Sequence, residues 1–228
     1  MGIAERKTRD FKRREQDILA AAVALIHERD IETVTIAEVA EQAEIGKGTV
    51  YKHFRSKEEI IARILLGVRQ RIHGELQREL VAGLGPAAVL RKIIGVYWRL
   101  HLEDPLFHLR MHSYVEKENF IARIRPELAK ELRAAQNSIL ALFSEFIQEG
   151  IKQGHFENGD VNQMLWAAGA AVAGAIRLAL SASSGYRGLF QREDFHQYLA
   201  DFILKGLGWK GETKGAKGRP TAKASRRR

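Results

Sequence analysis

The strongest constraint on the fold lies in residues 35–57, whose sequence is TIAEVAEQAEIGKGTVYKHFRSK. Thr35 stands three residues before Glu38, which is the spacing of a helix capping box. Four apolar residues then recur at i, i+3, i+4 and i+7, the spacing of one helical face: Ile36, Val39, Ala40 and Ala43. Residues 44–46 interrupt this pattern, and it resumes over 47–54. The segment therefore predicts two short helices joined by a tight turn.

The second of these helices has one apolar and one polar face. Val50 and Phe54 are expected to point inward, and the remaining side chains are polar or amphipathic: Lys47, Thr49, Tyr51, Lys52 and His53. Such groups bond to phosphates and to base edges in the grooves of DNA. Ser56 and Glu59 have the spacing of a second capping box, which predicts a third helix directly after the pair. The pattern favours a helix-turn-helix that contacts DNA.

The string KGTVYKHFRSKEEI, together with the helical stretch before it, resembles the DNA-binding domain of the TetR (tetracycline repressor) family. The resemblance covers roughly residues 14–65, and GTVYKHF followed by SKE is far more specific than a generic helix-turn-helix pattern. It implies an all-α protein with an N-terminal three-helix DNA-binding domain and a C-terminal helical domain for ligand binding and dimerisation. It also implies a ligand-responsive transcriptional regulator, most often a repressor, that binds a palindromic DNA operator as a dimer.

The residues expected to contact DNA lie in and around the second short helix: Thr35, Lys47, Gly48, Thr49, Tyr51, Lys52, His53 and Lys57. In the family that the segment resembles, residues at the Tyr51, His53 and Lys57 positions commonly meet phosphates. Thr35 is placed to present its helix N-terminus to a phosphate, where backbone N–H groups attract anions. A dimer is expected to read two half-sites about 34–36 Å apart.

Two positions differ from the family pattern. Glu44 occupies a turn position that usually holds glycine, and a positive φ there costs a non-glycine residue on the order of 1 kcal/mol. Gly46 stands where serine or threonine often caps the recognition helix, and glycine is a poorer cap by only a few tenths of a kcal/mol. Neither change threatens the predicted fold.

The net charge of +9 suggests nucleic-acid binding, but its distribution weakens that argument. Nine of the 37 Lys and Arg residues, and only one of the 28 acidic residues, lie from Lys205 onward. The preceding 204 residues therefore hold 28 basic and 27 acidic residues and are almost neutral. The DNA-binding prediction depends on where the charges lie and not on their total.

Prolines and glycines divide the rest of the chain into helices, and no useful alternating strand pattern occurs. Proline suits the first turn of a helix, and three prolines mark such starts: Pro86, Pro105 and Pro126. The predicted helices span about 14–28, 57–79, 86–102, 105–117, 126–153, 160–180 and 192–207. The expected organisation is a basic arm (1–13), a helix-turn-helix domain (14–56), a helical effector-binding and dimerisation domain (57–208) and a disordered basic tail (209–228).

Composition excludes several other classes. There are no cysteines, so disulfides, thiolate metal sites and cysteine nucleophiles are excluded, which fits a reducing cytoplasm. Residues 1–17 lack the apolar core of a signal peptide, and the apolar run 165–176 is too short for a membrane span. No nucleophile–base, paired-carboxylate or phosphate-loop motif is present, so neither an enzyme nor a cofactor is expected. We expect a cytoplasmic protein.

The last two predicted helices are more apolar than one domain needs. Small residues recur at i and i+4 in the first of them, as in the pair Gly169 and Ala173, and allow another helix to approach closely. Five apolar or aromatic residues line one face of the second: Phe195, Tyr198, Leu199, Phe202 and Ile203. We expect an isologous homodimer through these two helices, an arrangement that the family resemblance also implies. Packing within one chain is the alternative.

The region from 86 to 180 is expected to hold the effector pocket. Its candidate lining residues are Tyr97, Trp98, His101, Phe107, His108, Met111, Tyr114, Phe143, Trp166 and Arg177. Aromatic residues and methionine mixed with a few polar groups are typical of an adaptable, mostly apolar pocket. The predicted effector is therefore a small apolar or amphipathic molecule.

Polar residues in this region leave alternatives open. Arg177 interrupts the most apolar helix and must find a partner or reach water: it pairs with an acid across the dimer or binds an anionic ligand head such as a carboxylate or phosphate. His108, His112 and Glu116 fall at i, i+4 and i+8, a spacing that can bind a divalent metal. No further ligand is identifiable, and no metal site is predicted.

The two ends of the chain are strongly basic. Residues 6–14 hold six basic residues and one acid, and predict a loose arm that either is solvated or touches DNA. Residues 211–228 are expected to be disordered, and within them 217–220 resembles the core of an AT-hook. A ligand-independent structural DNA-binding protein, using arm and tail, is the alternative function.

Overall fold

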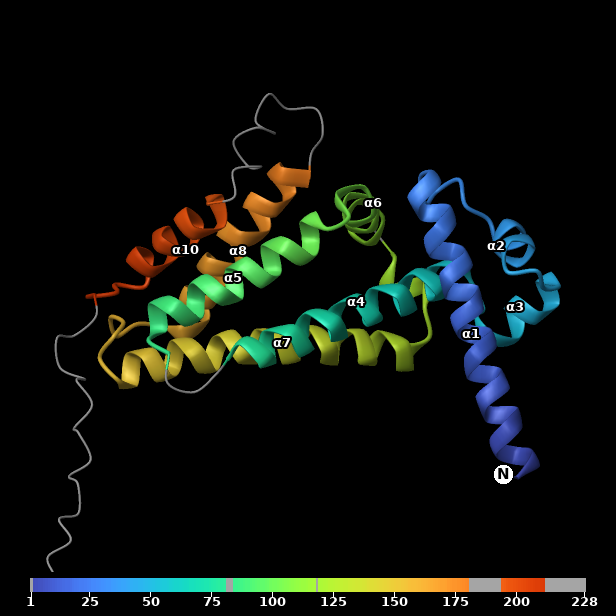
Figure 1. Ribbon diagram of the computed structural model, residues 1–228, viewed down its shortest axis with the longest axis horizontal. Helices are drawn as coiled ribbons and strands as arrows, with labels where there is room; N and C mark the ends of the chain where they lie inside the picture. The colour runs from blue at the N-terminus through green and yellow to red at the C-terminus, as the bar shows by residue number, and fades with distance from the viewer. Residues whose placement is uncertain (1, 81–83, 118, 181–193, 212–228) are drawn as a thin grey trace, which may run out of the picture.

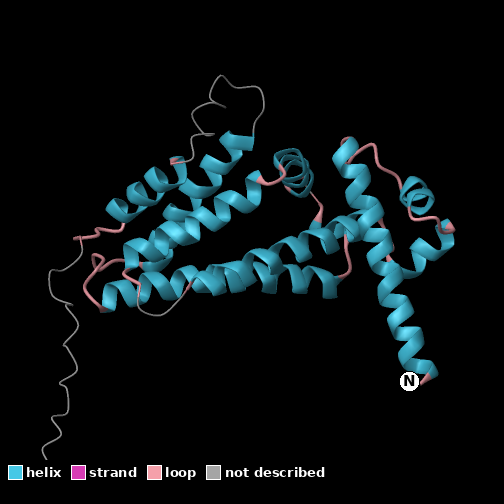
Figure 2. Ribbon diagram, in the orientation of Figure 1, coloured by secondary structure: helices cyan, strands magenta, loops and turns pink. Residues whose placement is uncertain are grey.

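The computed structural model describes residues 2–80, 84–117, 119–180 and 194–211. All regular secondary structure in these ranges is helical, as Figure 2 shows, and the predicted all-α class is confirmed. The elements are α1 (Ile3–Glu28), α2 (Ile36–Gln42), α3 (Lys47–His53), α4 (Lys57–Glu79), α5 (Pro86–Leu102), α6 (Pro105–Val115), η1 (Ile121–Arg123), α7 (Pro126–Lys152), α8 (Val161–Leu180) and α10 (Phe195–Gly206).

The helices form two connected bodies (Figure 1). Helices α1, α2 and α3 pack together at one end, and α4 runs from them along α7. Helices α5, α8 and α10 pack together at the other end, while α6 lies between α5 and α1. One buried apolar cluster joins the first three helices to α4, α6 and α7, and another joins α5, α8 and α10. The two bodies therefore share α4, α6 and α7 as connecting elements.

Local signals in the sequence set most helix starts. Pro86, Pro105 and Pro126 begin α5, α6 and α7 as predicted. The Thr35 hydroxyl accepts a hydrogen bond from the Glu38 backbone N–H, and the Glu38 carboxylate accepts one from the Thr35 N–H, which completes the predicted capping box. Such reciprocal bonds satisfy N–H groups that have no partner inside the helix.

The expectation of a loose basic arm is wrong. Helix α1 begins at Ile3 and spans 26 residues, so the segment 6–14 is helical. The Gly2 backbone N–H donates to the Glu5 carboxylate at 2.9 Å and closes the first turn. Lys, Arg, Glu and Ala are all good helix formers, and no proline or glycine interrupts the helix from Ile3 to Glu28. The residues of the basic run therefore favour the helix that the structure has.

Other boundaries differ in detail. Ser56 caps α4 as predicted, but the Glu59 carboxylate accepts from the Arg55 N–H at 2.8 Å instead of closing the second capping box. Trp209, placed in the predicted tail, packs partly buried against the cluster of α5, α8 and α10. The remainder of that tail, from 212 onward, lies outside the described residues, and so does the AT-hook-like segment 217–220. The folded part therefore extends slightly past the predicted boundary.

Candidate DNA interface and effector cavity

The turn between α2 and α3 has the strain that its sequence predicted. Glu44 has a φ of 53°, in the left-handed region that favours glycine. The next residue, Ile45, donates its N–H to the Ala40 carbonyl at 2.9 Å and closes the end of α2. Gly46 then occupies the N-cap of α3 with extended backbone and no side-chain cap bond. The orientation of α3 thus depends on one strained residue and one weak cap.

Helix α3 presents a short row of polar side chains to solvent. Lys47, Gly48, Tyr51 and Lys52 are exposed, whereas Val50 and Phe54 are buried, as predicted. Thr49 and His53, the other two predicted contacts in this helix, are half-buried. The Lys47 ammonium lies 6.0 Å from the centroid of the Tyr51 ring. These side chains form one continuous polar surface that suits phosphates and base edges.

Three of the predicted DNA contacts are engaged within the chain. The Lys57 ammonium donates to the backbone carbonyls of Ile31 and Glu32 at 2.9 and 3.0 Å, and burial lowers its pKa. The Thr35 hydroxyl donates to the Glu38 carboxylate at 2.8 Å. The third engaged contact is His53, whose ring is described below. Lys57 thus fastens α4 to the connector before α2, and Thr35 fastens the start of α2.

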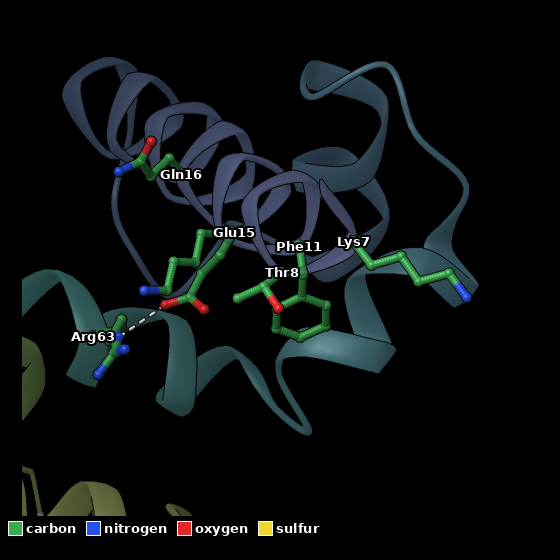
Figure 3. A pocket seen from close by; sticks show the side chains of 7 residues that line it. Lys7, Thr8, Phe11, Glu15, Gln16 and Arg63 are labelled. Carbon is green, nitrogen blue, oxygen red and sulfur yellow. Dashed lines mark hydrogen bonds and ion pairs between the residues drawn. The ribbon is translucent and has the colours of Figure 1, made fainter. Parts of the chain in front are cut away.

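His53 packs against the N-terminal half of α1. Its ring stacks on Phe11 with 4.0 Å between centroids, and its buried Nδ1 has no hydrogen-bond partner among the described residues. Burial lowers the pKa of His53, which keeps the ring neutral. Figure 3 shows Phe11 beside Thr8, and Glu15 joined to Arg63 of α4 by an ion pair of 2.9 Å. The helical extension of α1 is therefore attached to both α3 and α4.

The sequence interpretation missed Phe11. The only indication in the sequence was an aromatic residue within a basic run. Because a loose arm was expected there, no packing partner was expected for that residue. The helical periodicity of α1 places Phe11 on the same side as Thr8 and Glu15, which all line one shallow hollow. An aromatic residue at that position would have indicated a packed helix.

A buried ion pair connects α7 and α4 to the recognition helix. Glu59 is only 1% exposed, and its carboxylate accepts from Arg125 Nε at 2.8 Å and from the Arg125 backbone N–H at 3.2 Å. Arg125 Nη2 also donates to the His53 carbonyl at 3.3 Å. One arginine at the start of α7 therefore holds both the first turn of α4 and the last residue of α3.

Helix α6 holds the DNA-binding end by a second route. The Arg110 guanidinium donates to the carbonyls of Ile26 and His27 at the end of α1, where a helix leaves carbonyls unpaired. Asp104, which caps α6, lies 3.0 Å from the His27 ring. Tyr114 donates its hydroxyl to Glu58 at 3.2 Å, and burial raises the pKa of Tyr114 to about 12. A shift of α6 therefore acts directly on α1 and α4.

Two adjoining cavities lie between the helices: one of about 250 Å³ between α5, α6 and α8, and one of about 100 Å³ between α4, α5, α6 and α7. Both are lined by Tyr97, His101 and His112. Five predicted pocket residues line the smaller cavity: Tyr97, His101, Phe107, His108 and Met111. Arg177 lines the larger one. The cavities therefore contain six of the ten side chains that the sequence suggested.

The other four candidates lie elsewhere. Trp98 is buried against Phe195, with ring centroids 5.2 Å apart, and Tyr114 belongs to the cluster next to the DNA-binding end. Phe143 is half-buried in the apolar cluster between α4, α5 and α7. Trp166 is 64% exposed on α8, so its place in a pocket is contradicted. The helical periodicity of the sequence showed that these side chains lie on apolar faces. It did not show which other helix packs against each face.

Three histidines gather around the cavities. The His101 ring centroid lies 4.9 Å from that of His108 and 5.9 Å from that of His112. Burial lowers the pKa of His101 to about 4 and also lowers that of His108, so both rings are neutral near pH 7. Within the described residues, no group of three or more His, Cys, Asp or Glu residues is placed to hold a metal ion. These histidines therefore act as neutral hydrogen-bonding groups.

Two arginines face the cavities in different ways. Arg177 forms an ion pair with Glu116 of α6 in the same chain, and its side chain is 66% exposed. This pair lies within one chain, whereas the sequence predicted a partner across the dimer or an anionic ligand. Arg69, which the sequence interpretation missed, lines the smaller cavity from α4. Its spacing with Leu65 and Ile72, both lining residues, is the helical i, i+4, i+7 pattern that could have revealed it.

An apolar face covers parts of α8 and α10. Its largest exposed side chains are Trp166, Leu178, Tyr198 and Phe202, the last at 69% exposure. Helix α8 is also long and apolar enough to cross a membrane by length and composition, with a mean hydropathy of 1.4, which corrects the estimate from its shorter apolar run. One such helix is weak evidence for a membrane span. The continuation of the apolar face onto α10 points instead to contact with another protein surface.

A helix-turn-helix with an exposed polar helix, joined to a helical body, is the architecture of a DNA-binding transcriptional regulator. Residues 18–64 match the family model described as bacterial regulatory proteins, tetR family. The DNA-binding end of the chain therefore matches the TetR family. The TetR resemblance of the recognition segment is thereby confirmed.

Individual relatives agree with this assignment. The chain is 26% identical to the HTH-type transcriptional repressor KstR2 of Rhodococcus jostii over 149 residues, which are 64% of this chain and 69% of the relative. The TetR-family regulator PfmR of Thermus thermophilus aligns with a TM-score of 0.64 at 24% identity, over 83% of this chain and 98% of PfmR. RolR in complex with resorcinol aligns with a TM-score of 0.61 at 21% identity, over 89% and 91%. The two structures support the fold.

Proposed function

We propose that this protein is a dimeric repressor that binds a palindromic operator and leaves it when a small organic effector enters the cavities. The exposed row on α3, centred on Lys47, Tyr51 and Lys52, meets the major groove and its phosphates. One such helix reads only a few base pairs. A second copy is therefore required to read the other half-site, about 34–36 Å away.

The apolar face of α8 and α10 supplies the dimer contact. Trp166, Tyr198 and Phe202 are large apolar or aromatic side chains that are each more than 60% exposed, which favours contact with a partner surface. Small residues of α8, including Gly169 and Gly174, have open space beyond them, so a partner helix can approach closely. The same face on two copies makes an isologous interface, which closes as a dimer. The regulator then acts where the chromosome is, in the cytoplasm.

The observation that carries the mechanism is that the helices around the cavities also hold the DNA-binding end. Helix α6 lines both cavities and grips α1 through Arg110. Helix α4 lines the smaller cavity and is joined to α3 through Glu59 and Arg125. An effector that changes the spacing of α4 and α6 changes the distance between the two recognition helices. It acts only through its different affinity for the two arrangements.

The effector is expected to be compact. The cavities measure about 250 and about 100 Å³, small beside the roughly 300–1,000 Å³ of common ligand pockets. Their lining is mostly apolar with a few polar groups, which suits an amphipathic molecule. RolR, a structural neighbour, is known in complex with resorcinol, a molecule of this size class.

The test combines DNA selection with footprinting. The full chain is used to select sites from a random duplex library, and the selected DNA is footprinted. A short palindromic site protected on both halves supports the regulator, whereas continuous protection without sequence preference supports a structural DNA-binding protein and overturns the proposal. The Tyr51→Phe and Lys52→Ala variants should each weaken operator binding without changing the oligomeric state. Sedimentation measures that state, and a monomeric DNA complex contradicts the dimer.

A further inference from the structure

Arg69 is a cation in the wall of the smaller cavity, with no counter-ion in the part of the chain that the structure describes. Its Nη1 donates to the Leu132 carbonyl of α7 at 2.9 Å. Within the described residues, no carboxylate lies within ion-pairing distance of the guanidinium. Burial lowers the pKa of Arg69, but an arginine remains charged at neutral pH. A partly buried charge with only one carbonyl as partner is poorly compensated.

The surroundings of Arg69 contain apolar and neutral groups. The described residues that line this cavity include no Asp or Glu: Leu65, Val68, Arg69, Ile72, Tyr97, His101, Phe107, His108, Met111, His112, Val115, Gln136 and Ile139. His101 and His108 are neutral because burial lowers the pKa of each. Burial raises the pKa of Tyr97, so its hydroxyl stays protonated and can donate. The cavity therefore has one positive point, neutral donors and an apolar remainder.

Arg177, which lines the adjoining larger cavity, differs from Arg69 because it already has a counter-ion. Its guanidinium is mostly exposed and already paired with Glu116. An exposed ion pair of this kind contributes little and gains little from a second anion. Arg69 has no such partner and lies where water is scarce. An anionic ligand is therefore stabilised more by pairing with Arg69 than by pairing with Arg177.

We propose that the cavity binds a compact organic acid whose carboxylate pairs with Arg69 and whose apolar part fills the space toward α5 and α6. The planar guanidinium matches a carboxylate with two parallel hydrogen bonds, which a lysine cannot reproduce. The adjoining larger cavity, reached past Tyr97 and His101, receives the remainder of the molecule. This inference rests on the proposed effector role of the cavity and adds the chemical class of the effector.

The test compares acids with neutral amides of the same shape. Isothermal titration of the full chain uses 3-phenylpropanoate against 3-phenylpropanamide, and hexanoate against hexanamide, which separates aromatic from aliphatic acids. At least one acid should bind at least tenfold more tightly than its amide. The preference should fall to near one in Arg69→Gln, survive in part in Arg69→Lys, and stay unchanged in the control Arg91→Gln, because Arg91 pairs with Asp201 and lines neither cavity.

Each other outcome is decisive. Equal binding of acid and amide, binding of neither acid, or a preference that persists in Arg69→Gln overturns the inference. Circular dichroism reports whether Arg69→Gln folds; if it does not, the wild-type acid-to-amide ratio and the Arg69→Lys variant decide. Release of the selected operator is measured in parallel. If the acids bind but do not release DNA, the Arg69 site is supported and the effector role of the cavity is refuted. If the amides release DNA, only the preference for acids is refuted.

Discussion

The DNA-binding end and the cavities differ in how their polar groups are supplied. At the DNA-binding end, one helix of seven residues presents Lys47, Tyr51 and Lys52 to solvent. In the smaller cavity, Arg69, Tyr97 and three histidines come from three helices, and apolar side chains line the rest of the wall. The first surface can meet DNA without rearrangement. The second depends on the spacing of its helices, so it is the region where a ligand can change the structure.

The two regions meet at a small number of polar contacts. Arg125 joins Glu59 to the end of α3, and Arg110 joins α6 to the end of α1. In these contacts the two guanidinium groups, and not water, satisfy backbone carbonyls and a buried carboxylate. The comparison therefore predicts that substitutions at this junction affect stability more than substitutions within either region.

The largest effect is expected from Arg125→Met. It leaves the Glu59 carboxylate, 1% exposed, with only backbone N–H partners. Removing one member of a buried ion pair typically costs about 3–5 kcal/mol. Urea denaturation should show this loss in the free energy of unfolding. The double variant with Glu59→Gln should recover much of it, because no unpaired charge remains, and an equal loss in both proteins would show that the ion pair is unimportant.

The second effect is a loss of stability in mild acid that originates in the cavity. The pKa of His101 is about 4 in the folded chain against 6.5 when free, so the unfolded chain binds more protons between these values. Stability is therefore complete above pH 6.5, falls as the pH decreases and levels off below 4. For His101 alone the loss at pH 5 is about 2 kcal/mol.

His53, His108 and His112 change stability in the same direction, because burial lowers their pKa values too. Urea titrations at pH 7 and pH 5 measure the loss. The His101→Asn variant, which can keep a donor toward the Tyr97 carbonyl, should reduce the pH dependence. If the variant and the wild type lose equal stability at pH 5, the effect does not come from the cavity.

The same contrast explains what the sequence could predict. The capping box of Thr35, the strained Glu44 and the helix starts at Pro86, Pro105 and Pro126 depend on neighbours a few residues away, and each was predicted. Arg69, Arg125 and Phe11 were missed because their partners lie on other helices; Arg125 meets Glu59 from 66 positions away. Trp166 was placed in a pocket because periodicity marks an apolar face without saying what covers it.

Within the DNA-binding end, Glu44→Gly should stabilise the protein. Glu44 has a φ of 53° and is exposed, so glycine relieves strain without removing a buried contact. The gain is on the order of 0.5–1 kcal/mol, since the greater freedom of glycine in the unfolded chain offsets part of it. The Glu44→Ala variant removes the carboxylate but keeps the side-chain carbon, and should give no gain. A loss in Glu44→Gly would show that the carboxylate has a stabilising partner.

The smallest effect is expected from Gly46→Ser at the N-cap of α3. A side-chain carbon at Gly46 meets no atom within 4 Å, and the backbone is already extended as a cap requires. The serine hydroxyl can accept a free N–H of the first turn and adds a few tenths of a kcal/mol. Gly46→Ala, which offers no acceptor, should be less stable than the wild type. The three proteins are compared by their urea midpoints and by their affinity for the selected operator. Because only a local cap changes, the affinity for the operator should rise slightly or stay equal in Gly46→Ser. A clear fall in affinity would mean that DNA binding needs a mobile α3. The DNA-binding end would then be less preformed than its exposed row of side chains indicates.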